Sequence, residues 1–242
     1  AFTIARNDNM KIGVFCYNFN HWKTQSGIQN LVYSGYRPEV IFAADRVNLN
    51  FYQSKIRMSP KDLYLTHPRE LASFYKIDYH ASPHNSEATS NLVREYNLEL
   101  GIVLGARILK PSSFLPFSKG VMNMHPGLLP INRGLDTIKW AIIKRIPQGV
   151  TTHIIDDKID CGRLIQSNRI AIYKDDTLLD LKIRIQNLEQ EMMISSIKML
   201  ENKDLQALNI LHGGSYNKSV PPELESTLNE EFLKYKEVFA VT

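Results

Sequence analysis

The sequence predicts an α/β fold in which a mainly parallel sheet carries helices on both faces. Three short apolar runs, typical of buried parallel strands, cover residues 11–17, 40–44 and 100–105. Between them lie stretches whose apolar residues recur at helical spacing. Because parallel strands are joined by crossovers, this alternation predicts right-handed strand-helix-strand units and a sheet covered on both sides.

Helix start signals separate these strands. Thr24 is expected to cap the first helix, since a hydroxyl can accept a hydrogen bond from a free N–H of the first turn. Thr66 and Pro68 are expected to start a second helix, because proline fits the first helical position. Ser86 is expected to cap a third. The polar stretch 45–60 predicts an irregular excursion.

The C-terminal half continues the same alternation. Residues 120–125 predict a strand that ends in polar side chains, and Asp136 is expected to cap the helix after the next loop. The remaining elements are, in order, strands at 152–155 and 163–172, a long helix at 177–200 with one apolar side, and a last amphipathic helix opened by Pro221 and Pro222.

Size, charge and cysteine content exclude several classes of protein. With 242 residues, of which 43% are hydrophobic, the chain can bury a full core. The net charge of +4 arises from 29 basic and 25 acidic residues mixed along the chain, so no nucleic-acid partner is indicated. No apolar run approaches the roughly 20 residues that span a bilayer, so no membrane partner is expected. Cys16 and Cys161 lack the spacing of a disulfide framework or zinc site, which favours the cytoplasm.

A polar cluster follows the strand at 120–125. Asn123 and His125 are two residues apart, so on a strand they point to the same side, and strand ends are where open sheets bind ligands. An amide donor and an imidazole that face one spot suit the stabilisation of an oxyanion. Asp160 follows in a turn, where it could orient and charge His125 or collect a proton.

Each of these residues also has a structural interpretation. Asn-x-His at a strand end more often caps a loop than catalyses a reaction, and a single Asp before Gly is most often a turn residue. A metal-dependent hydrolase is a further alternative, because His125, His153 and Asp160 are ligand types of catalytic zinc. Their spacing lacks the helical His-x-x-x-His arrangement, so no metal is expected. His153 is expected to be packed and hydrogen-bonded, and Cys161 to be a small turn residue.

Taken together, the motifs resemble those of a known family. In order and spacing they are similar to the signature of the formyltransferases that use 10-formyltetrahydrofolate. That family includes glycinamide ribonucleotide transformylase, methionyl-tRNA formyltransferase and the sugar-nucleotide N-formyltransferases. The resemblance extends loosely from about Met10 to Leu200 and implies a Rossmann-like formyltransferase domain. The motifs that carry it are Asn123-x-His125, Leu128-Leu129-Pro130, Arg133-Gly134, Gly149-Val150-Thr151-x-His153 and Asp160-x-Gly162.

The resemblance also implies roles for individual residues. The catalytic triplet would be Asn123, His125 and Asp160, acting without a metal while a primary amine attacks the formyl carbon of the folate. Two segments would border the pterin of the cosubstrate 10-formyltetrahydrofolate. They are Arg107, Ile108 and Leu109, and the loop of Ile155, Asp156, Asp157 and Lys158.

The expected amine belongs to a nucleotide-linked amino sugar, as in the N-formyltransferases that serve O-antigen and lipopolysaccharide biosynthesis. Glycinamide ribonucleotide transformylase has a glycine-rich loop after its first strand, whereas residues 17–22 contain no glycine, so purine synthesis ranks second. Methionyl-tRNA formyltransferase, which carries a further C-terminal domain, and a non-catalytic binding module are more distant alternatives. Aromatic and amide side chains could stack a base and bind a sugar. The expected substrate-binding residues are Tyr17, Asn18, Asn20, His21, Trp22, Arg133 and Gly134.

Three segments are expected along the chain. Residues 1–9 would be a leader or an artificial remnant, 10–204 the catalytic domain, and 205–242 a C-terminal helical extension. The last helix carries an apolar stripe, which must be buried either in the core of the same chain or in a homodimer contact. The stripe includes Leu224, Leu228 and Phe232.

Overall fold

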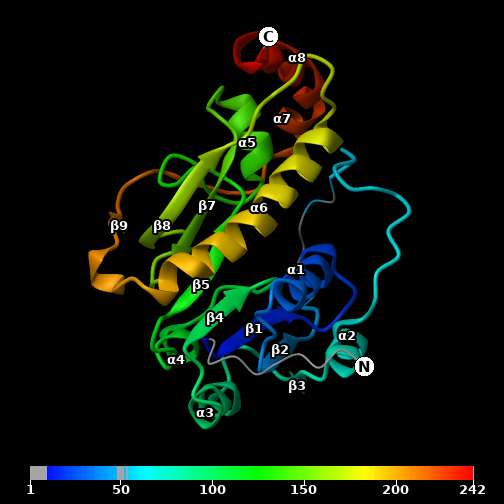
Figure 1. The fold of residues 1–242 in the computed structure, drawn as a ribbon. Coiled ribbons are helices and arrows are strands. Elements are labelled where there is room, and N and C mark those ends of the chain that lie inside the picture. The colour runs from blue at the N-terminus through cyan, green and yellow to red at the C-terminus, as the bar shows by residue number, and fades with distance from the viewer. Residues whose placement is uncertain (1–9, 48–51, 53, 242) are drawn as a thin grey trace. The chain divides into compact units, whose positions relative to one another are not determined.

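The computed structural model of the chain describes residues 10–47, 52 and 54–241. The expected leader at 1–9 lies outside the described residues. The described chain forms two compact units, and Figure 1 labels most of their elements. The first unit contains residues up to 47, 63–123 and 197–205, and the second contains 48–62, 124–196 and the chain from 206 onward. Strand β5 (Val121–His125) passes from the first unit into the second.

The first unit is built on a parallel sheet. Its strands lie in the order β3-β2-β1-β4-β5, and all their pairings are parallel, as predicted. The three apolar runs of the sequence form β1 (Ile12–Tyr17), β2 (Val40–Ala44) and β4 (Leu100–Val103). β3 (Asp78–Ala81) is not among the predicted strands, because its partly exposed polar residues lack the apolar run of a buried strand.

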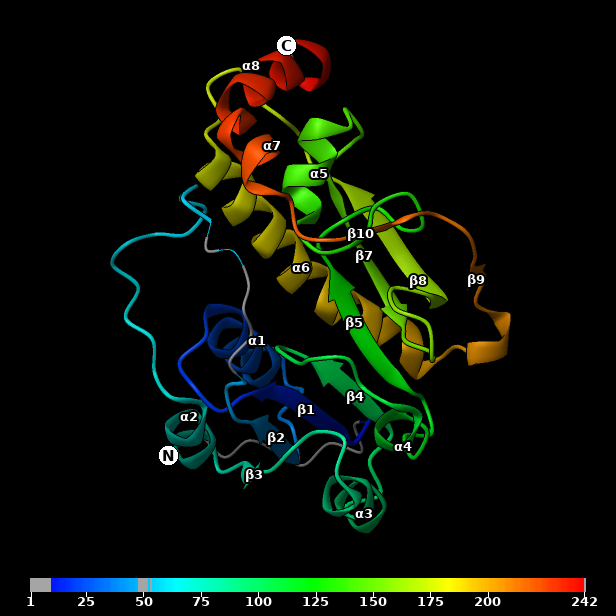
Figure 2. The same ribbon diagram turned by 180° about the vertical axis from the view of Figure 1, so that it is seen from behind.

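Helices cover both faces of this sheet. The helices that lie wholly within the described part of the first unit are α1 (Trp22–Tyr33), α2 (Pro68–Tyr75), α3 (Glu87–Glu95) and α4 (Pro111–Phe114). The chain moves in one direction across the sheet from β1 to β3 and returns from β3 to β4. Right-handed crossovers therefore place α1 and α3 on opposite faces (Figure 2).

The helix caps of the first unit agree only in part with the prediction. Ser86 caps α3 as predicted, and its side chain accepts a hydrogen bond from an N–H of the first turn. The prediction for Thr24 is wrong. α1 begins before Thr24, whose buried hydroxyl donates to the carbonyl of Leu104 at 3.0 Å. At α2 the capping residue is His67 rather than Thr66, because the imidazole accepts the free N–H.

The second unit contains antiparallel strands. β7 (Gly149–Ile154) pairs with β8 (Gly162–Arg169), and β8 pairs with the short β9 (Ile210–Leu211). The strands predicted at 152–155 and 163–172 are therefore present with shifted ends. β6 (Arg133–Gly134) and β10 (Tyr216–Asn217) form a separate parallel pair.

The helices of the second unit correct two predictions. The predicted long helix is α6 (Leu178–Glu201), which follows α5 (Thr137–Ile143). The single predicted last helix is wrong, because the chain breaks at Thr227 into α7 (Pro222–Ser226) and α8 (Leu228–Phe239). Asp136 stands at the N-cap position of α5, as predicted, but its side chain makes no capping bond, since its carboxylate accepts the N–H of Val220 at 2.9 Å instead.

The apolar stripe of the last helix is buried within the second unit except at Leu224, which lies in α7 and is 39% exposed. Leu228, Phe232 and Tyr235 of α8 pack in one core with Ile142 of α5 and Leu181 of α6. This core accounts for most of the stripe within the chain itself. None of the helices in residues 10–47 and 54–241 combines the length and the apolar character that crossing a bilayer requires.

A buried ion pair joins α5 to α7. Lys139 Nζ lies 2.6 Å from Glu225 Oε1 and 3.0 Å from the hydroxyl oxygen of Ser54. Burial alone would raise the pKa of Glu225, but hydrogen bonds from Lys139, Ser54 and the N–H of Lys55 lower this pKa to about 2. Glu225 therefore stays ionised at neutral pH and ties the C-terminal helices to α5.

We expect Glu225→Gln to lower the free energy of unfolding by about 3 kcal/mol at neutral pH, because Lys139 would remain buried without its close counterion, with only the Asp136 carboxylate at 4.0 Å. A carboxylate whose pKa is lower in the folded than in the unfolded protein stabilises the fold at pH values above its ordinary pKa, which is 4.5 for glutamate. That contribution is lost as the pH falls from 4.5 toward 2. Urea unfolding of both proteins across this range should show their difference shrinking.

The matched control is Glu223→Gln, which changes an exposed residue of the same helix. It should leave the free energy of unfolding nearly unchanged. A difference between wild type and Glu225→Gln that does not depend on pH would contradict this account of the ion pair.

Candidate active site

β5 carries Asn123 and His125 to its carboxyl end. Alternate residues of a strand point to the same side, so both side chains project from one face of β5. Asn123 is partly buried and closes the first unit, whereas the buried His125 belongs to the second. The geometry that follows lies entirely within the second unit.

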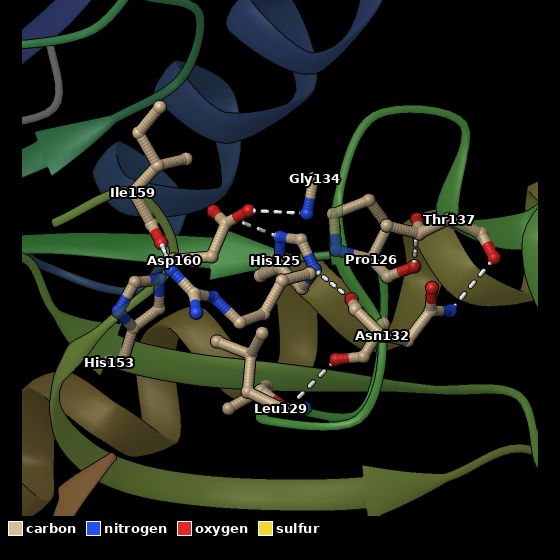
Figure 3. A network of polar contacts seen from close by, with 12 residues as sticks. His125, Pro126, Leu129, Asn132, Gly134, Thr137, His153, Ile159 and Asp160 are labelled. Atoms are coloured by element: carbon tan, nitrogen blue, oxygen red, sulfur yellow. Dashed lines mark hydrogen bonds and ion pairs between the residues drawn. The ribbon is translucent and has the colours of Figure 1, made fainter. Parts of the chain in front are cut away.

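His125 is held between two acceptors (Figure 3). Its Nε2 lies 2.8 Å from the main-chain oxygen of Asn132, and its Nδ1 lies 3.4 Å from Asp160 Oδ1. The second carboxylate oxygen of Asp160 accepts the N–H of Gly134 at 2.7 Å. The structure thus brings together the histidine and the carboxylate that the sequence motifs predict, and adds two main-chain groups from the loop between them.

These contacts determine the charge of Asp160. Burial alone would raise the pKa of Asp160, but the hydrogen bond and charge of His125 and the N–H of Gly134 lower this pKa below its ordinary value. Asp160 is therefore a carboxylate at neutral pH and can only accept. A neutral imidazole has a single N–H, so it could serve only one of its two acceptors. Only a ring that carries a proton on both nitrogens would donate to Asn132 and Asp160 at the same time.

The turn that presents Asp160 has an unusual backbone. Asp160 has a φ of 51° and Gly162 a φ of 97°, both in the left-handed region. Asp tolerates this region better than most residues, and such conformations gather at functional sites. Gly162 is required, because a Cβ there would lie 2.0 Å from the carbonyl oxygen of Ile154.

His153 contacts this turn and is buried and hydrogen-bonded, as predicted. Its Nδ1 lies 2.7 Å from the carbonyl oxygen of Cys161, the residue after Asp160. Burial and then the charge of His125 lower the pKa of His153 to about 4. A neutral His153 can donate Nδ1–H to that carbonyl, so its role is to fix the turn.

Neither cysteine is poised as a nucleophile. Cys16 and Cys161 are both buried and carry free thiols. Burial raises the pKa of each thiol, so neither is ionised at neutral pH.

The alternative metal site does not fit this geometry. A metal ligand needs a bare ring nitrogen, whereas both ring nitrogens of His125 face acceptors inside the protein. Among the described residues, no set of three or more His, Cys, Asp or Glu side chains is grouped so as to hold a metal ion.

Comparison with known proteins decides the family. Residues 50–197, more than half of the chain, match the family described as formyl transferase. The chain belongs to the formyl transferase family. Its motif residues His125 and Asp160 both lie inside the matched segment.

Individual relatives of the family differ in substrate. A methionyl-tRNA formyltransferase from Flavobacterium johnsoniae is 38% identical over 46% of this chain and 35% of its own length. A GDP-perosamine N-formyltransferase from Brucella melitensis is 31% identical over 43% of this chain and 41% of its own. The chain therefore spans less than half the length of these curated relatives.

Solved structures show the same fold. The phosphoribosylglycinamide formyltransferase of Streptococcus pneumoniae superposes with a TM-score of 0.61 at 23% identity, covering 80% of this chain and 99% of that one. A sugar N-formyltransferase from a Shewanella species gives a TM-score of 0.59 at 20% identity, covering 87% of this chain and 77% of that one. At such identities the similarity establishes the fold, which agrees with the predicted Rossmann-like formyltransferase domain.

The two segments predicted to border the pterin lie in different units. Arg107, Ile108 and Leu109 belong to the first, where Asn85 donates to the carbonyl of Ile108 and accepts the N–H of Lys110. Ile155, Asp156, Asp157 and Lys158 belong to the second, in the loop between β7 and β8. Their part in folate binding stays a prediction.

The loop after β1, predicted to bind substrate, is held by its own side chains. Tyr17 donates to the carbonyl of Ala106 at 3.1 Å, and burial raises the pKa of Tyr17 although the charge of Arg107 opposes this. Tyr17 stacks on Phe19, and the guanidinium of Arg46 lies 5.1 Å from the Phe19 ring centre. Within the first unit, this loop therefore lies against the segment that contains Arg107.

Other predicted substrate residues have partners inside the first unit. Asn18 donates to Asp45 at 2.6 Å, Asn20 donates to the carbonyl of Leu65 at 2.6 Å, and His21 contacts the hydroxyl of Thr24. Trp22 is the first residue of α1. Their contact with a substrate stays a prediction.

Arg133 and Gly134 also have roles inside the protein. The Arg133 guanidinium donates to the carbonyls of Gly213 and Gly214, at 3.1 and 3.2 Å, and to that of Ile159. These bonds tie β6 to the turn that holds Asp160 and to Gly213 and Gly214. Substrate binding by Arg133 stays a prediction, whereas its structural contacts are observed.

Two important positions have no prediction from the sequence. Asn132 is buried, and its main-chain oxygen binds His125, so its residue type gives no signal of this role. At Gly127, a Cβ would lie 2.9 Å from that oxygen and 3.0 Å from His125 Nε2. Any side chain at 127 would therefore enter the contact between His125 and Asn132.

We expect Gly127→Ala to weaken this contact and to lower the free energy of unfolding by about 1–3 kcal/mol, as overpacking does. The φ of Gly127 lies outside the left-handed range, so the loss would come from lack of space. The Nε2–H signal of His125 in ¹⁵N NMR of the ring should exchange faster with water. An unchanged signal would contradict the assignment.

Proposed function

We propose that the protein transfers the formyl group of 10-formyltetrahydrofolate to the primary amine of a nucleotide-linked amino sugar, such as a dTDP-4-amino-4,6-dideoxyhexose. The observation that carries the transfer reaction is the His125–Asp160 pair, which lies in a chain of the formyl transferase family. The choice of the sugar rests on the loop at 17–22 and on the relatives named above.

The donor groups fit the chemistry of formyl transfer. When bound, 10-formyltetrahydrofolate supplies a formyl carbon that an amine can attack. Negative charge then grows on the formyl oxygen, and the amine nitrogen must lose a proton. The imidazolium of His125 supplies positive charge for the oxygen, and Asn123 on the same face of β5 supplies an amide donor.

Asp160 is the proton acceptor in this proposal. Its two oxygens receive Gly134 N–H and face His125 Nδ1, and a carboxylate offers about four lone-pair positions, so it retains capacity for a further proton donor. The amine proton would pass to Asp160 as the bond from nitrogen to the formyl carbon forms. Its lowered pKa keeps Asp160 ionised before that step. The bond from the formyl carbon to the folate nitrogen would then break, and the proton would be returned to the folate nitrogen so that tetrahydrofolate leaves.

The amino-sugar substrate is supported by two observations. The loop after β1, residues 17–22, contains aromatic and amide side chains and no glycine that would form a close phosphate cradle. A relative at 31% identity is a GDP-perosamine N-formyltransferase, and a structural neighbour is a sugar N-formyltransferase. Glycinamide ribonucleotide is the second candidate, and methionyl-tRNA, the substrate named for the relative at 38% identity, is included as a third.

We expect His125→Ala and Asp160→Asn each to lower the turnover number by at least about 100-fold, as loss of an oxyanion donor or a general base does. Asp160→Asn is well suited, because asparagine tolerates the left-handed backbone at this position and still accepts the Gly134 N–H. The measurement is steady-state formyl transfer with purified protein of verified fold.

An exposed residue of the second unit provides a matched control. Asp175→Asn makes the same chemical change as Asp160→Asn away from the site and should retain wild-type turnover. Turnover close to that of wild type in both site variants would overturn the assignment of the pair.

The substrate is tested by a panel of amines with 10-formyltetrahydrofolate as donor. The panel contains dTDP-, UDP- and GDP-linked amino sugars, glycinamide ribonucleotide and methionyl-tRNA. We expect turnover of one nucleotide-linked sugar. Transfer only to glycinamide ribonucleotide or methionyl-tRNA would overturn the amino-sugar substrate but support formyl transfer. Absence of transfer to every amine would favour a non-catalytic binding module.

A further inference from the structure

Residues 206–220, which we call the C-terminal strap, touch both segments that meet at the His125–Asp160 pair. β9 of the strap pairs with the start of β8, where Gly162 follows the Asp160 turn. β10 pairs with β6, whose Gly134 N–H binds Asp160. Figure 2 shows the strap passing from β9 to β10. It lies beyond residue 197, where the match to the family ends.

One side chain of the strap reaches toward the site. Asn217 of β10 is 5% exposed, and its Nδ2 donates to Asn132 Oδ1 at 3.1 Å. Its Oδ1 accepts a hydrogen bond from the ammonium of Lys144. Because an ammonium can only donate, this bond sets the orientation of the amide, with the NH₂ group directed at Asn132.

The orientation of Asn132 follows in the same way. Its Oδ1 is used by Asn217, and its Nδ2 donates to the carbonyl of Thr137 at 2.8 Å. A flipped Asn132 amide would set its oxygen against that carbonyl and its NH₂ group against a donor. The residue is 1% exposed, so water cannot compensate, and its main-chain oxygen stays directed at His125 Nε2.

The backbone of Asn217 is fitted just as closely to β6. Its carbonyl accepts the N–H of Leu135 at 2.9 Å. A Cβ at Gly134 would lie 2.1 Å from this carbonyl oxygen, so only glycine allows the strands to approach this far. Because the carbonyl of Asn217 accepts the N–H of Leu135, the N–H of Gly134 is available to Asp160.

We propose that Asn217 is a positioning residue for the His125–Asp160 pair. Through the chain of bonds from Lys144 to Asn217 to Asn132, it holds the carbonyl that binds the Nε2–H of His125 and so keeps the opposite nitrogen directed at Asp160. Its effect on formyl transfer rests on the proposed function. Its effect on the ring of His125 does not.

The test compares Asn217→Asp with Asn217→Ala in the full chain. Asn217→Asp keeps the volume and the contact with Lys144 but replaces the NH₂ donor with an acceptor that faces Asn132 Oδ1. The matched control is Tyr216→Ala, the neighbouring residue of β10, whose side chain is 43% exposed. Thermal unfolding identifies any variant that fails to fold.

The direct readout is ¹⁵N NMR of the histidine rings, with the His125 signals assigned by their loss in His125→Ala. We expect the Nε2–H of His125 to exchange with water about tenfold faster, or to disappear, in both Asn217 variants and to stay unchanged in Tyr216→Ala. Unchanged ring signals in a folded Asn217→Asp would overturn the proposal.

The kinetic readout uses whichever amine the panel identifies. We expect the turnover number to fall about tenfold in Asn217→Asp while KM changes less than about twofold, because the pair is misaligned and the substrate sites are intact. If the wild-type protein transfers no formyl group but the Asn217 variants alter the His125 ring signals, the proposed function is disproved and the positioning role of Asn217 is supported. A change in KM alone would assign Asn217 to substrate binding and overturn the proposal.

Discussion

The second unit is organised around a histidine that faces an acceptor at each ring nitrogen. A buried charge is costly unless it is paired and hydrogen-bonded, so an imidazolium at His125 requires both Asp160 and the carbonyl of Asn132. Neither partner lies on a helix or strand that would place it beside His125. Asn132 is brought there by the loop after β5, and Asp160 by the turn between β7 and β8. Arg133 and the strap hold these two segments in place.

This convergence explains three glycines around the pair. Gly127, Gly134 and Gly162 each stand where a Cβ would lie within 3 Å of a main-chain oxygen. In each case the oxygen belongs to a segment that helps to hold the pair, either the Asn132 loop, the strap or the end of β7. The glycines are therefore required because two segments of the chain approach closely at each position. At 134 and 162 a positive φ requires glycine as well.

The sequence predicts those parts of the structure that depend on local patterns, and it fails where a residue acts on a distant segment. The apolar runs at β1, β2 and β4 predict their strands because a strand buried on both faces needs apolar residues throughout. The hydroxyl of Thr24 misleads, since it can serve a cap or a distant carbonyl equally well, and here it binds Leu104. His125 and Asp160 are predictable from their motifs, whereas Asn217 acts on Asn132 across 85 positions, which no local pattern records.

The unequal contacts of His125 suggest how the pair divides its work in the proposed reaction. The bond to Asn132 is short, at 2.8 Å, whereas the contact with Asp160 is long, at 3.4 Å, so the ring is anchored by the carbonyl. Asp160 is anchored independently by Gly134 at 2.7 Å. Taking up an amine proton at Oδ1 would therefore disturb only the weaker of these contacts. His125 would keep its place through the bond to Asn132, while Asp160 carries the proton.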